Sequence, residues 1–125
     1  SQIGVPLAVW QMQSVHQLGI FEAGISRVGE MENLQRIMNP TLGIFTNLGT
    51  AHDEGFTSPQ VKAREKLRLF HGVSKLVYCS DDQTIEKEVN QLNIPAVTWA
   101  VERNAHYQVK LQQHQISILH GTKVI

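Results

Sequence analysis

Apolar residues in this chain recur in two ways, as short continuous runs and as positions spaced three or four apart. Continuous runs that end in glycine or in polar residues predict buried strands over residues 18–25, 42–49, 75–80 and 96–101. The intervening segments show helical spacing instead. The order strand, helix, strand is therefore expected through most of the chain.

Three helices are predicted between these strands. Residues 29–39 carry apolar side chains at helical spacing, and Pro40 prevents the helix from continuing. Ser58 is a typical N-cap for a second helix, because a proline follows it at the first helical position. A third helix is expected over residues 83–92, after two aspartates that can cap its first turn.

Toward the C-terminus the pattern changes to strict alternation. Residues 106–113 and 115–121 alternate polar and apolar side chains, as expected for an antiparallel pair with one solvent-facing side. Alternating strands and helices indicate βαβ crossovers. The predicted fold class is therefore α/β, with a mainly parallel sheet, helices on both faces and an antiparallel edge.

Composition narrows the range of partners. The 125 residues are enough for one domain, and the 11 basic residues are balanced by 11 acidic ones, so no strongly basic surface for nucleic acid is expected. Every apolar run is shorter than the roughly 20 residues of a membrane helix, so no membrane insertion is expected. The lone Cys79 excludes an internal disulfide and favours a cytoplasmic protein.

Polar residues gather where two predicted strands end. Glu22 lies toward the end of the first strand, and Asn47 and His52 follow the second, within TNLGTAHDEGF. Ligands of parallel sheets bind beyond the carboxyl ends of the strands. Glu22 is there either a hydrogen-bonded structural residue or a metal ligand, and His52 is a structural residue, a ligand or a general base. Lys66 lies among apolar residues, so it either joins a solvated basic face or points inward.

Four motifs in order carry a family resemblance. The succession IGVP, FEAGISRVGEM, TNLGTAHDEGF and AREKLRLF, from residue 2 to about residue 82, resembles the central domain of the Mur ligases, ATP-dependent amide-forming enzymes of peptidoglycan synthesis. Within that family, the GEM and AHxEGF forms are most similar to the members that join D-alanyl-D-alanine to UDP-N-acetylmuramoyl-tripeptide. The resemblance thus implies ATP and Mg²⁺ as cofactors, and these two compounds as substrates.

The resemblance also implies roles for individual residues. Glu22 and His52 match ligands of two magnesium ions, and Lys66 matches a lysine that the family carbamylates. Carbon dioxide adds to a neutral amine and converts a cation into an anion that can orient a metal site. Lys66 and His52 are therefore the expected catalytic residues.

Three further positions receive weaker assignments from the same resemblance. Asn47 matches a nucleotide-proximal asparagine, and Gln2 and Ser26 match positions near the UDP-muramoyl substrate or the metal.

The implied reaction forms an acyl phosphate on the tripeptide carboxylate, which the amine of D-alanyl-D-alanine then displaces. A P-loop, GxxxxGK[ST], does not occur in the sequence. Residues 1–125 are thus expected to be a partial Mur ligase central domain, an ATP-binding domain that does not catalyse the reaction alone. Two alternatives are a ligase resembling folylpolyglutamate synthase, which shares the TNxGxxH pattern, and a non-catalytic α/β module.

Overall fold

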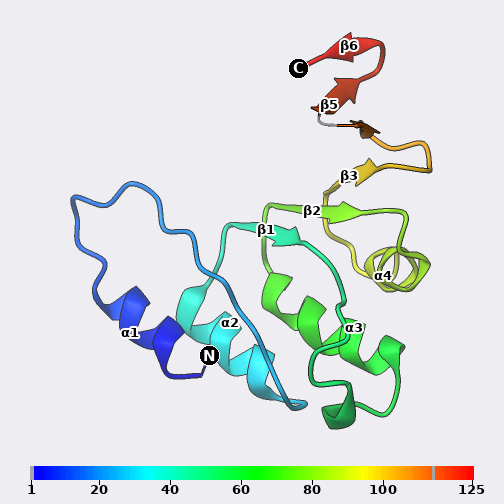
Figure 1. Cartoon of the computed structure of the whole chain (residues 1–125). Coiled ribbons are helices and arrows are strands. Elements are labelled where there is room, and N and C mark those ends of the chain that lie inside the picture. The colour runs from blue at the N-terminus through cyan, green and yellow to red at the C-terminus, as the bar shows by residue number, and fades with distance from the viewer. Residues whose placement is uncertain (1, 114) are drawn as a thin grey trace.

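The structure is a computed structural model that describes residues 2–113 and 115–125. A six-stranded sheet has the order β1-β2-β3-β4-β5-β6, and three helices, α2 to α4, pack beside its first strands (Figure 1). The strands are β1 (Leu42–Phe45), β2 (Lys75–Cys79), β3 (Ala96–Ala100), β4 (Tyr107–Gln112), β5 (Gln115–His120) and β6 (Lys123–Val124). The α-helices are α1 (Gly4–Trp10), α2 (Glu30–Met38), α3 (Pro59–Leu67) and α4 (Gln83–Val89), and two 3₁₀ turns are η1 (Asp53–Gly55) and η2 (Arg68–Phe70).

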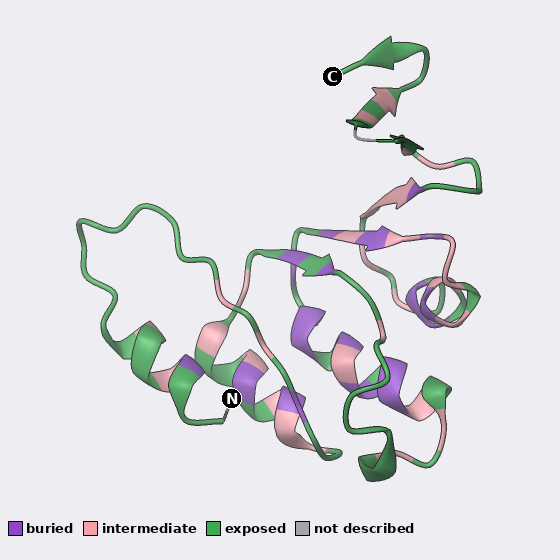
Figure 2. Cartoon of the chain, in the orientation of Figure 1, coloured by how far each residue is buried: buried purple, intermediate pink, exposed green. Residues whose placement is uncertain are grey.

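The mixed sheet confirms the predicted pairing. Strands β1 to β4 pair in parallel, and β4, β5 and β6 pair antiparallel. Strand β4 meets β3 only through two residue pairs, so it continues beyond the end of β3. Its antiparallel partners are mostly exposed (Figure 2). The described helices are all too short to cross a bilayer.

Beside β1, the described helices lie on one face of the sheet (Figure 1). On β1, Gly43 and Phe45 are buried, whereas Leu42 and Ile44 on the other face are about two-thirds exposed, at 65% and 67%. The order β1-β2-β3 explains this, because two successive right-handed crossovers in the same direction place their helices on one side. The mutual packing of α3 and α4 agrees with that arrangement.

The core lies between this helical layer and the first three strands. Leu34 of α2, Leu76 of β2 and Ile85 of α4 are fully buried, and the Phe45 and Phe70 rings lie 6.1 Å apart, tilted by 60°. A Cβ at Gly43 would collide with the Phe70 ring, so only glycine lets η2 approach β1 this closely. Truncation of a buried leucine, isoleucine or phenylalanine to alanine typically lowers the free energy of unfolding by about 2–5 kcal/mol.

Two helix starts follow the sequence signals. Ser58 Oγ accepts a hydrogen bond from the amide of Val61 at the start of α3, at 3.2 Å. The Asp82 carboxylate accepts from the amides of Thr84 and Ile85 at the start of α4. Both residues thereby satisfy amides that have no partner within their own helices.

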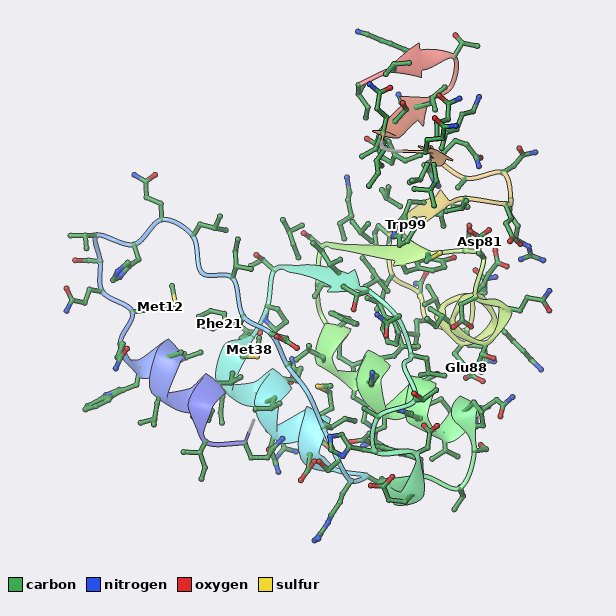
Figure 3. All side chains as sticks on the ribbon, in the orientation of Figure 1. Met12, Phe21, Met38, Asp81, Glu88 and Trp99 are labelled. Carbon is green, nitrogen blue, oxygen red and sulfur yellow. The ribbon has the colours of Figure 1, made fainter. Side chains whose placement is uncertain are left out.

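The predicted strand over residues 18–25 is wrong. This segment is part of an irregular, mostly exposed loop between α1 and α2 (Figure 2). A strand needs a hydrogen-bonded neighbour. In the described residues β1 pairs only with β2, so residues 18–25 do not pair with its other edge and form no ladder. Instead, Met12 and Phe21 lie against Gly19 inside the loop (Figure 3).

Candidate functional site

The candidate site lies in the loop that follows β1, where helix α3 packs against it. Lys66 is half-buried on α3, and its Nζ donates a hydrogen bond to the carbonyl oxygen of Leu48 at 2.7 Å. The carbonyl oxygen of Asn47 lies at 3.5 Å from the same nitrogen, and the Phe45 ring centroid at 6.0 Å. Lys66 therefore points toward the end of β1 and does not join a solvated face.

The surroundings of Lys66 disfavour its charged form. Burial lowers the pKa of the Lys66 amine, and the nearby positive charge of Lys62 lowers it further. The Asp53 carboxylate opposes both effects. A lowered pKa increases the share of neutral amine, which is the form that reacts with carbon dioxide or another electrophile.

A second lysine, which sequence reasoning missed, lies one helical turn earlier. Lys62 is 2% exposed, and its Nζ donates to the carbonyl oxygens of Gly49 at 3.0 Å and Ala51 at 2.6 Å. It also forms an ion pair with Asp53 Oδ1 at 2.6 Å. The spacing of Lys62 and Lys66, four residues on one helix, was the available signal that both could face the same loop.

His52 lies between two residues that Lys62 holds. Its backbone is left-handed, with φ of 61°, and its carbonyl accepts a hydrogen bond from the Gly55 amide at 3.0 Å. This conformation is uncommon for a residue other than glycine. The His52 side chain is exposed, so its imidazole is available to a ligand from outside the chain.

Ser26 meets the same loop through its backbone. A Cβ at Gly55 would collide with the carbonyl oxygen of Ser26, so the two segments touch closely. The amides of Ser26 and Arg27 donate to the Glu30 carboxylate at 2.7 and 3.1 Å, and these hydrogen bonds, led by that of Ser26, lower the pKa of Glu30. The carboxylate thus fixes the turn that precedes α2.

The buried Glu65 joins this turn to helix α3. Glu65 Oε1 accepts from the amides of Gly29 at 2.6 Å and Met31 at 3.3 Å, and so caps the start of α2. Its other oxygen pairs with Arg68 at 3.2 Å. The segments SRVGEM, AHDEGF and AREK of the sequence are therefore joined at one place in the fold.

Two expected site residues are not placed at this junction by any contact. Glu22 is exposed in the loop between α1 and α2, and within residues 2–113 and 115–125 its carboxylate has no hydrogen-bond or ion-pair partner. Gln2 is exposed just before α1. The convergence of Glu22 with His52 and Lys66 stays a prediction.

The donor atoms at the junction do not form a complete metal cage. The described part of the chain contains no group of three or more histidine, cysteine or acidic side chains that could hold an ion. Magnesium does not need such a group, because it usually binds one or two protein ligands together with waters and substrate phosphates. The exposed imidazole of His52 fits that partial role, whereas the nearby carbonyl oxygens already accept hydrogen bonds from Lys62 and Lys66.

A groove elsewhere on the surface has a different character. Its volume is about 570 Å³, and it lies between α2, α3 and α4. Its arginines are already neutralised, since Arg64 pairs with Glu88 at 2.7 Å and Arg68 pairs with Glu32 at 3.2 Å. These ion pairs explain the charge of the groove without a ligand.

Comparison with known proteins identifies relatives of one kind. The family model of the Mur ligase middle domain matches residues 1–124 and so extends beyond the motifs that end near residue 82. The UDP-N-acetylmuramoyl-tripeptide--D-alanyl-D-alanine ligase of Treponema pallidum (strain Nichols) is 40% identical over 70 residues, 56% of this chain and 15% of the relative. The ligase of the same name from Bacillus subtilis (strain 168) is 27% identical over 113 residues, 88% of this chain and 24% of the relative.

A solved structure has the same fold. The crystal structure of MurF ligase from Thermotoga maritima in complex with ADP matches with a TM-score of 0.66 and 19% identity, over 80% of this chain and 25% of that one. This chain thus spans a quarter or less of the length of each of these relatives. Because the family model covers nearly every residue, the chain belongs to the Mur ligase middle-domain family.

Proposed function

We propose that this chain is part of an ATP-dependent ligase that joins D-alanyl-D-alanine to UDP-N-acetylmuramoyl-tripeptide in peptidoglycan synthesis in the cytoplasm. Its family membership and the names of its relatives support this activity. The observation that carries the proposal is the half-buried Lys66, whose Nζ is directed at the loop after β1.

In this proposal Lys66 carries a carbamate. The neutral amine attacks carbon dioxide, an N–C bond forms, and one proton leaves to solvent. Burial and the charge of Lys62 favour the neutral amine, since both lower the pKa of Lys66. The carbamate would replace a cation at the end of β1 by an anion, which can orient a bound magnesium ion.

The other site residues surround the nucleotide in the same proposal. His52 and Glu22 would hold magnesium, Asn47 would lie near the ATP, and Gln2 and Ser26 would approach the UDP-muramoyl substrate. The ADP complex of the Thermotoga maritima ligase supports nucleotide binding by this fold. Bound magnesium would neutralise negative charge on the phosphates.

The reaction proceeds in two displacements. A carboxylate oxygen of the tripeptide attacks the γ-phosphorus of ATP, which breaks the bond to ADP and forms an acyl phosphate. The amine of D-alanyl-D-alanine then attacks the acyl carbon, phosphate leaves with the carboxylate oxygen, and the amine nitrogen loses one proton to solvent as the amide forms. The protein's contribution is to position the groups and to stabilise the developing charge.

Phosphate release by the full-length protein that contains this chain tests the proposal. With ATP and Mg²⁺ present, release should require both UDP-N-acetylmuramoyl-tripeptide and D-alanyl-D-alanine. Replacement of Lys66 by alanine should lower the rate by about 100- to 1,000-fold, as when a preorganised charge-stabilising group is lost. Lys87→Ala, which removes an exposed lysine from α4, is the matched control and should leave the rate unchanged.

Two outcomes would contradict the proposal. Release that depends on a folate and glutamate would assign the protein to the folylpolyglutamate synthase type. Absence of release with either substrate pair would support a non-catalytic module.

A further inference from the structure

Lys62 does not take part in the reaction proposed above, yet it is among the most completely buried side chains of the chain. A buried ammonium is costly unless its protons find acceptors. Lys62 Nζ has three, the carbonyl oxygens of Gly49 and Ala51 and the carboxylate of Asp53, all within 3.0 Å. All three acceptors belong to one five-residue stretch, residues 49–53, of the loop after β1.

Two of the three acceptors belong to the residues on either side of His52 in the sequence. Ala51 precedes His52 directly and Asp53 follows it directly, so one ammonium holds the residue on each side. The His52 backbone lies at φ of 61°. Backbone in this region is retained only where the surroundings determine it fully. Two amides of the turn contribute, since Gly55 donates to the His52 carbonyl and Phe56 to the Asp53 carbonyl. The hydrogen bonds of Lys62 add the link from helix α3 to residues 51 and 53.

Other contacts fix Lys62 in turn. Its helix is joined to the start of α2 through Glu65, which accepts from two amides there. The Phe56 ring, just beyond η1, lies with its centroid 5.9 Å from Lys62 Nζ. The ammonium thus lies between helix α3, which is joined to α2, and the Phe56 ring at the end of the loop.

We propose that Lys62 is a positioning residue, which holds the 49–53 loop so that the His52 imidazole is presented to the metal-nucleotide site. This inference rests on the proposed function, in which His52 is a magnesium ligand. Lys62 itself touches neither the substrate nor the metal. It acts through the backbone on either side of His52, as residues behind a metal ligand commonly do.

The test uses the full-length protein and the variant Lys62→Met, which keeps an unbranched apolar stem without the ammonium. Hydrogen–deuterium exchange of peptides that span residues 49–57 should accelerate by about tenfold, because the turn closed by the Gly55 amide opens more often. Peptides from α4 should exchange as in the unchanged protein. Val73→Ala, which removes buried apolar atoms away from this loop, is the control for general destabilisation.

A second readout addresses the metal. The Mg²⁺ concentration that gives half-maximal phosphate release should rise by about 10- to 100-fold in Lys62→Met, the usual effect of removing support behind a metal ligand. Lys62→Arg, which keeps a cation and its donors, should recover part of this loss. Val73→Ala should leave the half-maximal Mg²⁺ concentration unchanged.

Asp53→Asn keeps the inference testable if Lys62→Met does not fold. The Asp53 side chain is 60% exposed, so its replacement does not create a cavity. It should accelerate exchange over residues 49–57, by less than Lys62→Met does.

Unchanged exchange over residues 49–57 in these variants, or acceleration equal to that in Val73→Ala, would overturn the inference. Faster local exchange with an unchanged Mg²⁺ requirement would also overturn it, because Lys62 would then be structural only. If the unchanged protein releases no phosphate, the proposed function fails, and the exchange data still decide whether Lys62 holds the loop.

Discussion

At the scale of single residues, the two lysines of α3 are the same residue type in different surroundings. Lys62 and Lys66 lie one turn apart on the same helix and bind the same loop. Lys62 is saturated by three acceptors, one of them a carboxylate. Within residues 2–113 and 115–125, the hydrogen-bond acceptors of Lys66 are carbonyl oxygens, and its pKa is lowered by burial and by the charge of Lys62. The first is suited to hold structure and the second to react.

Asp81, at the end of β2, provides a prediction at this scale. Its carboxylate accepts hydrogen bonds from the backbone amides of Val101, Glu102 and Arg103, and these bonds, led by that of Val101, lower its pKa. A carboxyl group with a lowered pKa stabilises the fold above its unfolded pKa of about 3.9. That stabilisation is lost as the pH falls through the lower pKa of the folded state.

Asp81→Asn should therefore lower the free energy of unfolding near neutral pH, while the difference from the unchanged protein should shrink toward zero below the folded pKa of Asp81. Urea unfolding across the acidic range measures this. Glu102→Gln is the control, because the Glu102 carboxylate has no hydrogen bond or ion pair among the described residues. A difference between Asp81→Asn and the unchanged protein that persists unaltered into strong acid would contradict the role of the charge.

At the scale of elements, the turn before α2 and the η1 turn depend on each other. The Ser26 carbonyl occupies the space that a side chain at residue 55 would need. Both partners of this contact are backbone, so neither can yield by changing a rotamer. The pair explains why glycine follows the acid in AHDEGF.

Gly55→Ala should destabilise the protein by about 1–3 kcal/mol, the usual cost of an added methyl group that forces the backbone to move. Equilibrium urea unfolding gives this value. Gly24→Ala, at a position where nothing lies within 4 Å of the new Cβ, is the matched control. Equal stability of the two variants would show that the close approach of residues 26 and 55 is absent in solution.

Helices and caps that depend on local sequence could be predicted. Strands, which depend on a pairing partner elsewhere in the chain, could not always be predicted. Helix α2 and the caps Ser58 and Asp82 follow from local chemistry. The run over residues 18–25 has strand-like composition, but a strand also requires a pairing partner, which composition does not reveal. The coverage of one sheet face depends on strand order, which periodicity does not contain either.

Part of the candidate site could likewise be predicted from the sequence. The motifs named His52 and Lys66, and the inward direction of Lys66 is confirmed by its hydrogen bond to Leu48. Lys62 was missed because a lysine in a basic helix resembles a solvated one until its acceptors are known. The Glu65 cap of α2 joins residues 29 and 65, and no local pattern predicts so distant a pair.

At the scale of the whole molecule, the chain combines a helix-covered parallel sheet with an exposed antiparallel end (Figure 2). The candidate site lies near the carboxyl end of β1, where ligands of α/β sheets commonly bind. The residues with a proposed role in the chemistry therefore all lie before β2. Strands β4 to β6 contain none of them.

The transfer of oxygen from the tripeptide carboxylate to phosphate is the most direct test of the proposed ligase reaction. The full-length protein would be given ATP, Mg²⁺, D-alanyl-D-alanine and UDP-N-acetylmuramoyl-tripeptide labelled with ¹⁸O in its terminal carboxylate, and the released phosphate would be analysed by mass spectrometry. We expect one labelled oxygen in each phosphate, because the acyl phosphate breaks at its acyl–oxygen bond. Amide product accompanied by unlabelled phosphate, or no product at all, would contradict the proposed reaction.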